Sequence, residues 1–485
     1  MFPTLTPNPV EAGVVAHFLT NMNIFPGRAS LEGLEIEIFK LISNGATPEQ
    51  WKEWLRVPLE HAAARGNVDL FNKLLGAGAN GSAGWRGCGG RTLFDAAAVG
   101  GNVEVVTALL LAGAQPDVKV VSCSSKRSAL YTATILGHGA VAKQLVVAGA
   151  EVNFEDPVNR RSVLAAATWG GQEQLVADLL IVGAYPFWQD GCDGGGSLLH
   201  IAVEKGFDGI LSTLLLGGGN KDAIDHDERT PLIWASWRGR LSAVKILLAA
   251  GADASIRDFA GFSALDHAAK GGHVDTLRAI VEHGADVNAG DEEGFNALHV
   301  AAVNNQAGAI NALVQAGADV ELKRVDGCTP IGSAAYIRCR IAMLALLQHG
   351  VKVGVRDNDG DTPLHQACWG AREGVEAAVD LLLRWGADEA ALNNSGQSPA
   401  EWLDMENGDG VNGKLATQDE IERARLLLAR APADRAWRRR GWLVMLRSRA
   451  QKARIASSCD DGRAAGAGLN DVVDRQRENC KEARR

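Results

Sequence analysis

Hydrophobic and polar positions follow a clear pattern between Asp359 and Asp388. Thr362 and Pro363 predict the start of a short helix, because a threonine hydroxyl caps a helix and proline is tolerated at the first helical position. Apolar side chains then recur at helical spacing on one face, and a second amphipathic run extends over 375–385. Gly386 predicts the end of that run, since glycine readily adopts the left-handed conformation at a helix C-terminus.

The same pattern returns along most of the chain. A glycine, in most cases followed by alanine, ends each second run, and successive glycines are 33 to 36 residues apart. Two short helices with narrow apolar faces cannot bury those faces against each other alone, so each unit is expected to stack on its neighbours. The glycines that mark the repeat are Gly45, Gly78, Gly113, Gly149, Gly183, Gly218, Gly251, Gly284, Gly317, Gly350 and Gly386.

The start of the unit recurs as well. The tetrapeptide Thr-Pro-Leu-His at 362–365 has variants at 197–200, 230–233, 296–299 and 329–332. With the aliphatic pairs that precede the glycines, these residues resemble the ankyrin-repeat family, most strongly over 196–390. The resemblance implies an all-α repeat fold, an ankyrin-type α-solenoid of about ten to eleven helix-turn-helix units joined by short β-hairpin loops.

We therefore predict one elongated array whose two ends differ from its middle, because one face of each terminal repeat meets water. Gly-rich and polar stretches predict smaller loops inserted at 81–90, 119–128 and 188–196. The predicted segments are an irregular N-terminal lead (1–30), a degenerate N-terminal capping repeat (31–56), the ankyrin repeat array (57–390), a partial C-terminal repeat (391–430) with a loop inserted at 404–419, a basic aromatic helix (431–455) and a disordered tail (456–485).

Composition narrows the class of protein without changing the predicted fold. The chain has 485 residues, a formal net charge of −9 and 46% hydrophobic residues. No basic residue precedes Arg28, and no run of about 18 apolar residues occurs, so we expect neither a secretory signal nor a membrane span. The eight cysteines include no Cys-x-x-Cys pair and favour buried, reduced thiols. We expect a cytoplasmic protein, with the nucleus as the alternative.

Sequence motifs for catalysis or metal binding are missing. No Gly-x-Ser-x-Gly, Walker or kinase pattern occurs, and no cysteine and histidine spacing fits zinc. The run 357–361 lacks the glycine position and the final glutamate of a calcium loop. By the family resemblance, His200, His299 and His365 are structural hydrogen-bonding groups tied to the turn. We expect no enzyme, no metal, no cofactor and no small-molecule substrate.

The repeat register indicates a candidate binding surface. Positions are counted from the Thr of Thr-Pro-Leu-His. In the ankyrin-repeat family, position eight lies on the first helix toward the concave face and is commonly polar. Aromatic rings are costly on an exposed surface and dominate interface energetics, so this set predicts a partner-binding patch. The alternative is that the rings pack on neighbouring repeats or on the inserted loops. The aromatic residues in these slots are Trp169, Trp237, Tyr336 and Trp369, with Trp234 at position five.

Acidic residues recur at the predicted hairpin tips. The candidates for contact with a partner are Asp227, Asp291, Glu292, Asp326 and Asp359. An acidic rim around an aromatic floor would favour a basic or amphipathic protein segment and speed its association. A solvated charged face is the alternative, because acidic tips are common in the resembling family.

The segment 434–455 differs from the rest of the chain. It holds eight basic residues and one acidic residue around the apolar run 442–446, and includes Arg438, Arg439, Arg440, Arg447 and Arg449. We predict a non-enzymatic protein-protein interaction scaffold or adaptor that binds an unknown partner's segment on the concave face. The alternatives are a peripheral tether to anionic membrane or nucleic acid through 434–455, which we do not favour, and a groove autoinhibited by that segment.

Overall fold

The computed structural model describes residues 56–76, 92–116, 128–187, 195–369, 373–404 and 415–432. The chain divides into two compact units, one up to Ala264 and one from Leu265, and each is described by itself. Of the predicted segments, 1–30, 456–485 and nearly all of 31–56 and 431–455 lie outside the described residues, as do most positions of the predicted loops at 81–90, 119–128, 188–196 and 404–419.

The first unit is a series of helix pairs. From α6 on, the first helix of each pair starts behind a capping serine or threonine, as α14 does behind Thr230, which accepts a hydrogen bond from the backbone N–H of Ile233. The pairs are α4 (Arg56–Ala64) with α5 (Val68–Gly76), α6 (Leu93–Gly100) with α7 (Val103–Leu111), α8 (Ala129–Ile135) with α9 (Gly139–Val147), α10 (Val163–Trp169) with α11 (Glu173–Ile181), α12 (Leu198–Lys205) with α13 (Asp208–Leu216), and α14 (Pro231–Trp237) with α15 (Leu241–Ala249).

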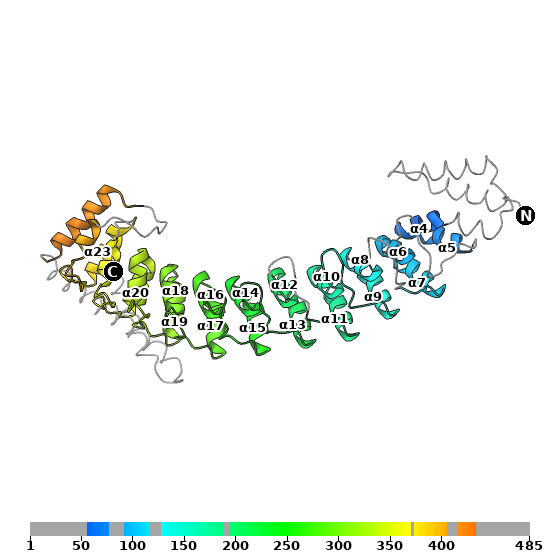
Figure 1. The fold of residues 1–485 in the computed structure, drawn as a ribbon, viewed down its shortest axis with the longest axis horizontal. Coiled ribbons are helices and arrows are strands. Elements are labelled where there is room, and N and C mark those ends of the chain that lie inside the picture. Colours follow the sequence, from blue (N-terminus) through cyan, green and yellow to red (C-terminus); the bar gives the residue numbers. More distant parts are fainter. Residues whose placement is uncertain are drawn as a thin grey trace, which may run out of the picture. The chain divides into compact units, whose positions relative to one another are not determined.

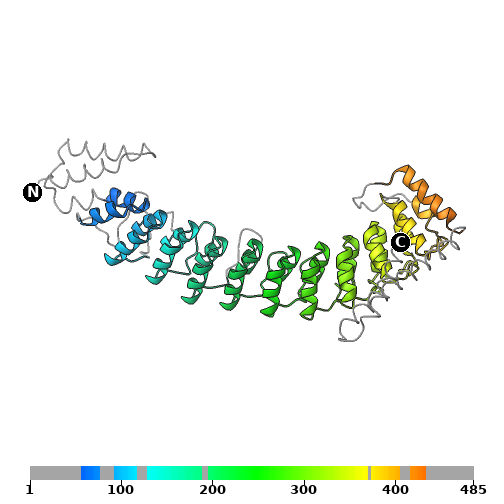
Figure 2. The ribbon, with the colours of Figure 1, turned by 180° about the vertical axis from the view of Figure 1, so that it is seen from behind.

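Stacking of these pairs makes the core of the first unit. The first helices α8, α10, α12 and α14 form one row and contact one another in sequence, while α9, α11, α13 and α15 form a second row (Figure 1). The view from behind shows the same two rows (Figure 2). Ala166 and Ala167 of α10 are buried, and their small side chains let neighbouring helices approach closely.

The second unit repeats this arrangement. Its helices are α16 (Ala264–Gly271), which begins at the boundary, α17 (Val274–Glu282), α18 (Ala297–Val303), α19 (Ala307–Gln315), α20 (Pro330–Ile337), α21 (Arg340–Gln348), α22 (Pro363–Cys368) and α23 (Val375–Arg384), followed by the 3-10 turn η2 (Glu401–Asp404) and a helix over 418–432. First helices α18, α20 and α22 contact one another, as do second helices α19, α21 and α23.

Helix ends agree with the sequence pattern. As predicted, α22 begins at Pro363 behind Thr362, and α23 begins at Val375 and ends one residue before the expected position. Gly386 after it has a φ of 91°, in the left-handed region that favours glycine. The described hairpin tips contain isolated β-bridges, such as Glu155 with Ser162, and no longer strand. The predicted all-α repeat fold is confirmed.

Candidate functional site

In the first unit, three of the five predicted aromatic residues lie on first helices. Trp169 ends α10, whereas Trp234 and Trp237 lie one turn apart on α14. Trp169 is 38% exposed and Trp237 is 43% exposed, while Trp234 is half-buried. Their surroundings decide what chemistry this face offers.

Two cations contact the ring of Trp169. The Cζ atom of Arg161, from the preceding hairpin, lies 4.7 Å from the ring centroid. The Nζ atom of Lys205, at the end of α12 in the next repeat, lies 4.1 Å from it. Both distances fall within the range of a cation–π interaction. Lys205 also lies 3.8 Å from the carboxylate of Glu204, so the ring, the two cations and one carboxylate form a group across two repeats.

The two indoles of α14 share two guanidinium groups. Arg229 lies 5.9 Å from each ring centroid, and Arg238 lies 5.4 Å from Trp234 and 5.3 Å from Trp237. The carboxylates of Asp225 and Asp227 pair with Arg229. Within the described part of the chain, no carboxylate pairs with the exposed Arg238.

We call the three indoles and the four cations around them the cation–indole cluster. They occupy three consecutive repeats and come from the hairpin tips and from the ends of first helices. The sequence prediction included the aromatic members but not the cations around them. The cluster consists of Trp169, Trp234, Trp237, Arg161, Lys205, Arg229 and Arg238.

The aromatic pair of the second unit has a different environment. Trp369, directly after α22, is half-buried, and its ring centroid lies 4.7 Å from that of Trp402 in η2. Trp402 is itself buried and meets His365 edge-on at 5.6 Å. Tyr336 at the end of α20 is half-buried. Trp369 therefore packs against the last described repeat, which is the alternative that the sequence left open for these rings.

The acidic tip residues fall into two groups. Asp291 is half-buried, and its Oδ1 accepts hydrogen bonds from the backbone N–H groups of Glu293 and Phe295. Such a carboxylate holds the turn, as Asx turns do. Glu292, Asp326 and Asp359 are exposed and are carried outward by these turns.

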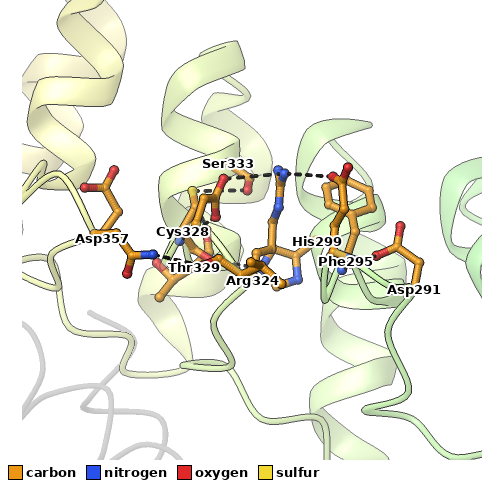
Figure 3. A network of polar contacts seen from close by, with 12 residues as sticks. Asp291, Phe295, His299, Arg324, Cys328, Thr329, Ser333 and Asp357 are labelled. Carbon is orange, nitrogen blue, oxygen red and sulfur yellow. Dashed lines mark hydrogen bonds and ion pairs between the residues drawn. The ribbon is translucent and has the colours of Figure 1, made fainter.

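A polar network links neighbouring tips of the second unit (Figure 3). The guanidinium of Arg324 lies 5.1 Å from the ring centroid of Phe295 and 3.4 Å from the carboxylates of Glu293 and Asp326. The Sγ atom of Cys328 lies 3.5 Å from Oγ of Ser333. Arg324 thus neutralises part of the acidic charge along this row of tips.

The three predicted structural histidines have the expected contacts. Nε2 of His200 lies 2.8 Å from the carbonyl oxygen of Arg229 in the next repeat, and its Nδ1 lies 2.9 Å from Oγ of Ser197. His299 and His365 repeat this arrangement with equivalent partners. Burial lowers the pKa of His200 and of His299 to about 4, and it also lowers the pKa of His365. These imidazoles are neutral fold-forming groups, as predicted.

The described cysteines belong to the packed interior. Burial raises the pKa of Cys368 to about 12, so its thiol stays protonated at neutral pH. Cys339 is also buried, and Cys328 is half-buried. The described residues contain no group of three or more histidine, cysteine, aspartate or glutamate side chains placed to hold a metal ion. Of the helices in these ranges, none has the length and apolarity needed to cross a bilayer.

Sequence reasoning missed a row of exposed aliphatic side chains at the ends of second helices in the first unit. We call it the aliphatic row. Each member lies two residues before a repeat-ending glycine, so the signal was present in the sequence. The equivalent residues of the second unit, Glu282, Gln315, Gln348 and Arg384, are polar or charged. The members are Leu111, Val147, Ile181 and Leu216, which are 84%, 81%, 82% and 90% exposed.

Arg438, Arg439, Arg440, Arg447 and Arg449 lie outside the described residues. The tether and autoinhibition alternatives that depend on them remain predictions.

Comparison with known proteins adds an independent finding. A family model described as ankyrin repeats (3 copies) matches residues 59–156, 163–258, 250–324 and 309–393, which together make up more than half of the chain. An ankyrin repeat protein of fowlpox virus (strain NVSL), FPV223, is 31% identical over 133 residues, which are 27% of this chain and 90% of the viral protein.

Two longer proteins are similar over part of their length. The nuclear factor NF-kappa-B p105 subunit of Rattus norvegicus is 32% identical over 174 residues, which are 34% of this chain and 17% of that protein. Palmitoyltransferase AKR1 of Kluyveromyces lactis is 33% identical over 139 residues, which are 28% of this chain and 18% of that protein. The chain thus spans less than a fifth of each of these two relatives.

Proposed function

The chain belongs to the ankyrin-repeat family, and from this premise we propose that it is a non-enzymatic scaffold that holds a segment of a partner protein on the face formed by its first helices. Ankyrin arrays serve protein-protein interaction, and the choice of partner depends on surface residues and not on the fold. The observation that carries the proposal is the partial exposure of Trp169 and Trp237 in the cation–indole cluster.

Exposed indoles on a rigid face are suited to binding. Tryptophan and arginine are enriched among the residues that dominate binding energy, and helices position them more firmly than loops do. Trp234 is fixed by a hydrogen bond from its Nε1 to Oδ2 of Asp225, so part of the face is already ordered before a partner arrives. A preordered surface loses less conformational entropy on binding.

Catalysis is not part of this proposal. The palmitoyltransferase activity in the name of one relative belongs to a protein of which the matched residues are 18%. In the described residues, burial at repeat contacts shifts the pKa values of His200, His299 and Cys368. These three side chains lie in three different repeats and do not share a cleft.

For the second unit we propose the partner chemistry that its tips favour. Exposed carboxylates at Glu292, Asp326 and Asp359 lie on successive tips and would attract a basic or amphipathic segment, with Asp291 holding its turn in place. Arg324 limits this attraction at the tip where it pairs with Asp326.

A site-specific crosslink tests where the partner lies. A photoreactive phenylalanine derivative is placed at Trp237, or at exposed Lys245 on second helix α15, in the full-length protein. We expect a partner protein from cell extract to be crosslinked by the probe at position 237 and not by the probe at position 245. Both labelled proteins should have the circular dichroism of the unaltered protein. Equal crosslinking at both positions, or a partner seen at 245 alone, would contradict the proposed face.

A further inference from the structure

We propose that the cation–indole cluster of the first unit binds an acidic segment of the partner protein, one in which carboxylates alternate with apolar side chains. The inference rests on the proposed function and specifies its ligand for this unit. It differs from the basic partner that the acidic tips suggested from sequence.

Charge around the indoles carries the argument. Cations lie over the faces of the rings of Trp169, Trp234 and Trp237, whereas the carboxylate of Asp225 meets Trp234 at its edge, where it accepts the hydrogen bond from Nε1. At the tip before α14 the carboxylates of Asp225 and Asp227 both pair with Arg229, so the cation left for a ligand at these two indoles is Arg238. A basic segment that approached the indoles would meet guanidinium and ammonium groups of its own sign.

The geometry of Arg238 favours a carboxylate. The Cζ atom of its guanidinium lies 5.4 Å and 5.3 Å from the ring centroids of the two indoles of α14, and a carboxylate can bind two N–H donors of a guanidinium at once. Among the described residues no carboxylate takes this position, and Arg238 is exposed. The cation is therefore close to both indoles and accessible.

A second anchor lies two repeats earlier. Lys205 and Arg161 contact Trp169, and Lys205 is exposed; in the described ranges the carboxylate that pairs with it is that of Glu204, at 3.8 Å. Each anchor joins cations to an indole that also offers apolar ring surface, which suits an apolar side chain. The cluster therefore offers two groups of cation and indole, one on each side of α12.

A uniform polyanion fits this surface less well than an acidic peptide. Asp227 and Glu228 are exposed beside Arg229, and the whole chain carries a formal charge of −9. These carboxylates would repel a nucleic acid along much of its length, because nucleic-acid binding needs several phosphate neutralisations. A peptide with two or three carboxylates meets the cations without that repulsion.

A random 12-residue peptide library displayed on phage, selected against the full-length protein, tests the inference. We expect enriched peptides to carry at least two Asp or Glu residues. Trp237→Ala and Arg238→Gln should each weaken their binding at least tenfold, and salt should weaken it as well. Lys245→Gln removes the same charge from a second helix and Phe259→Ala removes an aromatic ring that is 82% exposed, and both controls should bind as the unaltered protein does.

Other outcomes overturn the inference. Enriched peptides that are neutral or basic, and whose binding is lost in Trp237→Ala, would place the partner on this face but contradict an acidic ligand. The proposed function would remain intact. Peptides unaffected by both cluster variants would remove the cluster as a site. If a labelled 20-nucleotide RNA bound more tightly than the enriched peptides, and this binding were lost in Arg238→Gln, the surface would be assigned to nucleic acid instead.

Discussion

The indole of Trp234 donates a hydrogen bond of 2.8 Å from Nε1 to Oδ2 of Asp225, nine residues earlier in the chain. The other oxygen of this buried carboxylate accepts the backbone N–H groups of Asp227 and Arg229, so one side chain joins the hairpin tip to α14. In the second unit Gln366 donates to Asp357 with the same distance and the same separation in sequence. This bond therefore follows the repeat register, and two different side chains satisfy it.

Loss of that donor should destabilise the protein. In Trp234→Phe the buried Oδ2 of Asp225 loses its indole donor but keeps Arg229 at 3.3 Å, so we expect a loss of about 1 kcal/mol, the net contribution of one hydrogen bond. Gln366→Met removes the equivalent donor from the second unit with little change in volume, and we expect a loss of similar size. Urea unfolding of the full-length protein followed by circular dichroism measures both effects. Phe259→Leu, at an exposed tip, should stay within about 0.5 kcal/mol of the unaltered protein, and equal stability of all variants would contradict the role of this bond.

Stability should fall as the pH is lowered below neutrality. Burial lowers the pKa of His200 and of His299 from 6.5 to about 4, so the unfolded chain binds protons there at a pH where the folded chain does not. Their contribution to stability is complete above pH 6.5 and is lost as the pH falls toward 4. At pH 5 this loss is about 2 kcal/mol for each histidine.

Asp361 opposes this trend. Burial raises its pKa to about 6, so the folded chain holds that proton more strongly than the unfolded chain does, and its contribution is present at low pH and lost as the pH rises through 6. Two histidines outweigh one aspartate, and a net loss remains. Unfolding curves at pH 7 and pH 5 measure it, and His299→Gln should show a smaller difference between the two pH values. An unchanged difference in that variant would show that His299 is not responsible.

Local chemistry explains why the fold could be predicted. Thr362, Pro363 and Gly386 act through the backbone of their own helices, so their roles follow from residue type and order. The histidines also keep fixed partners, because each reaches a backbone carbonyl that every repeat supplies.

The candidate site could be predicted only in part, because its energetics depend on side chains from neighbouring repeats. Position eight identified Trp169 correctly as a first-helix residue, but its contacts with Arg161 and Lys205 require the stacking geometry. Trp369 occupies the same register position, yet Trp402 from a partial repeat covers it. Sequence register alone does not distinguish these two environments.

Gly332 occupies the place of the histidine in one repeat of the second unit. A Cβ atom added there would lie 3.0 Å from Sγ of Cys328, closer than such atoms normally approach. The small hollow at this point is lined by both residues and by Asp357, Asp361 and Gln366. Cys328 therefore takes part of the space that a histidine would fill.

A double-mutant cycle should reveal this exchange of volume. Gly332→Ala alone should gain little or lose stability, although alanine is about 1 kcal/mol better than glycine within a helix. In the presence of Cys328→Ala the same change should be stabilising by about that amount, because the clash is removed. Thermal unfolding of the four proteins measures the coupling. Additive effects would mean that Cys328 yields freely and does not restrict position 332.

The aliphatic row should be neutral for stability, because its side chains contribute little to the core. Ile181 and Leu216 are 82% and 90% exposed, and substitutions at exposed positions usually change the free energy of unfolding by no more than about 0.5 kcal/mol. Ile181→Gln and Leu216→Gln introduce the residue that the second unit carries at Gln315 and Gln348. Together they should leave the urea midpoint unchanged and reduce the fluorescence of an apolar dye such as anilinonaphthalene sulfonate. As the control, Leu214→Gln, on the same helix as Leu216, replaces a fully buried side chain and should destabilise the protein strongly. If the two exposed substitutions lowered the midpoint as much as the buried one, these side chains would have to belong to the packed interior and could not form an exposed apolar surface.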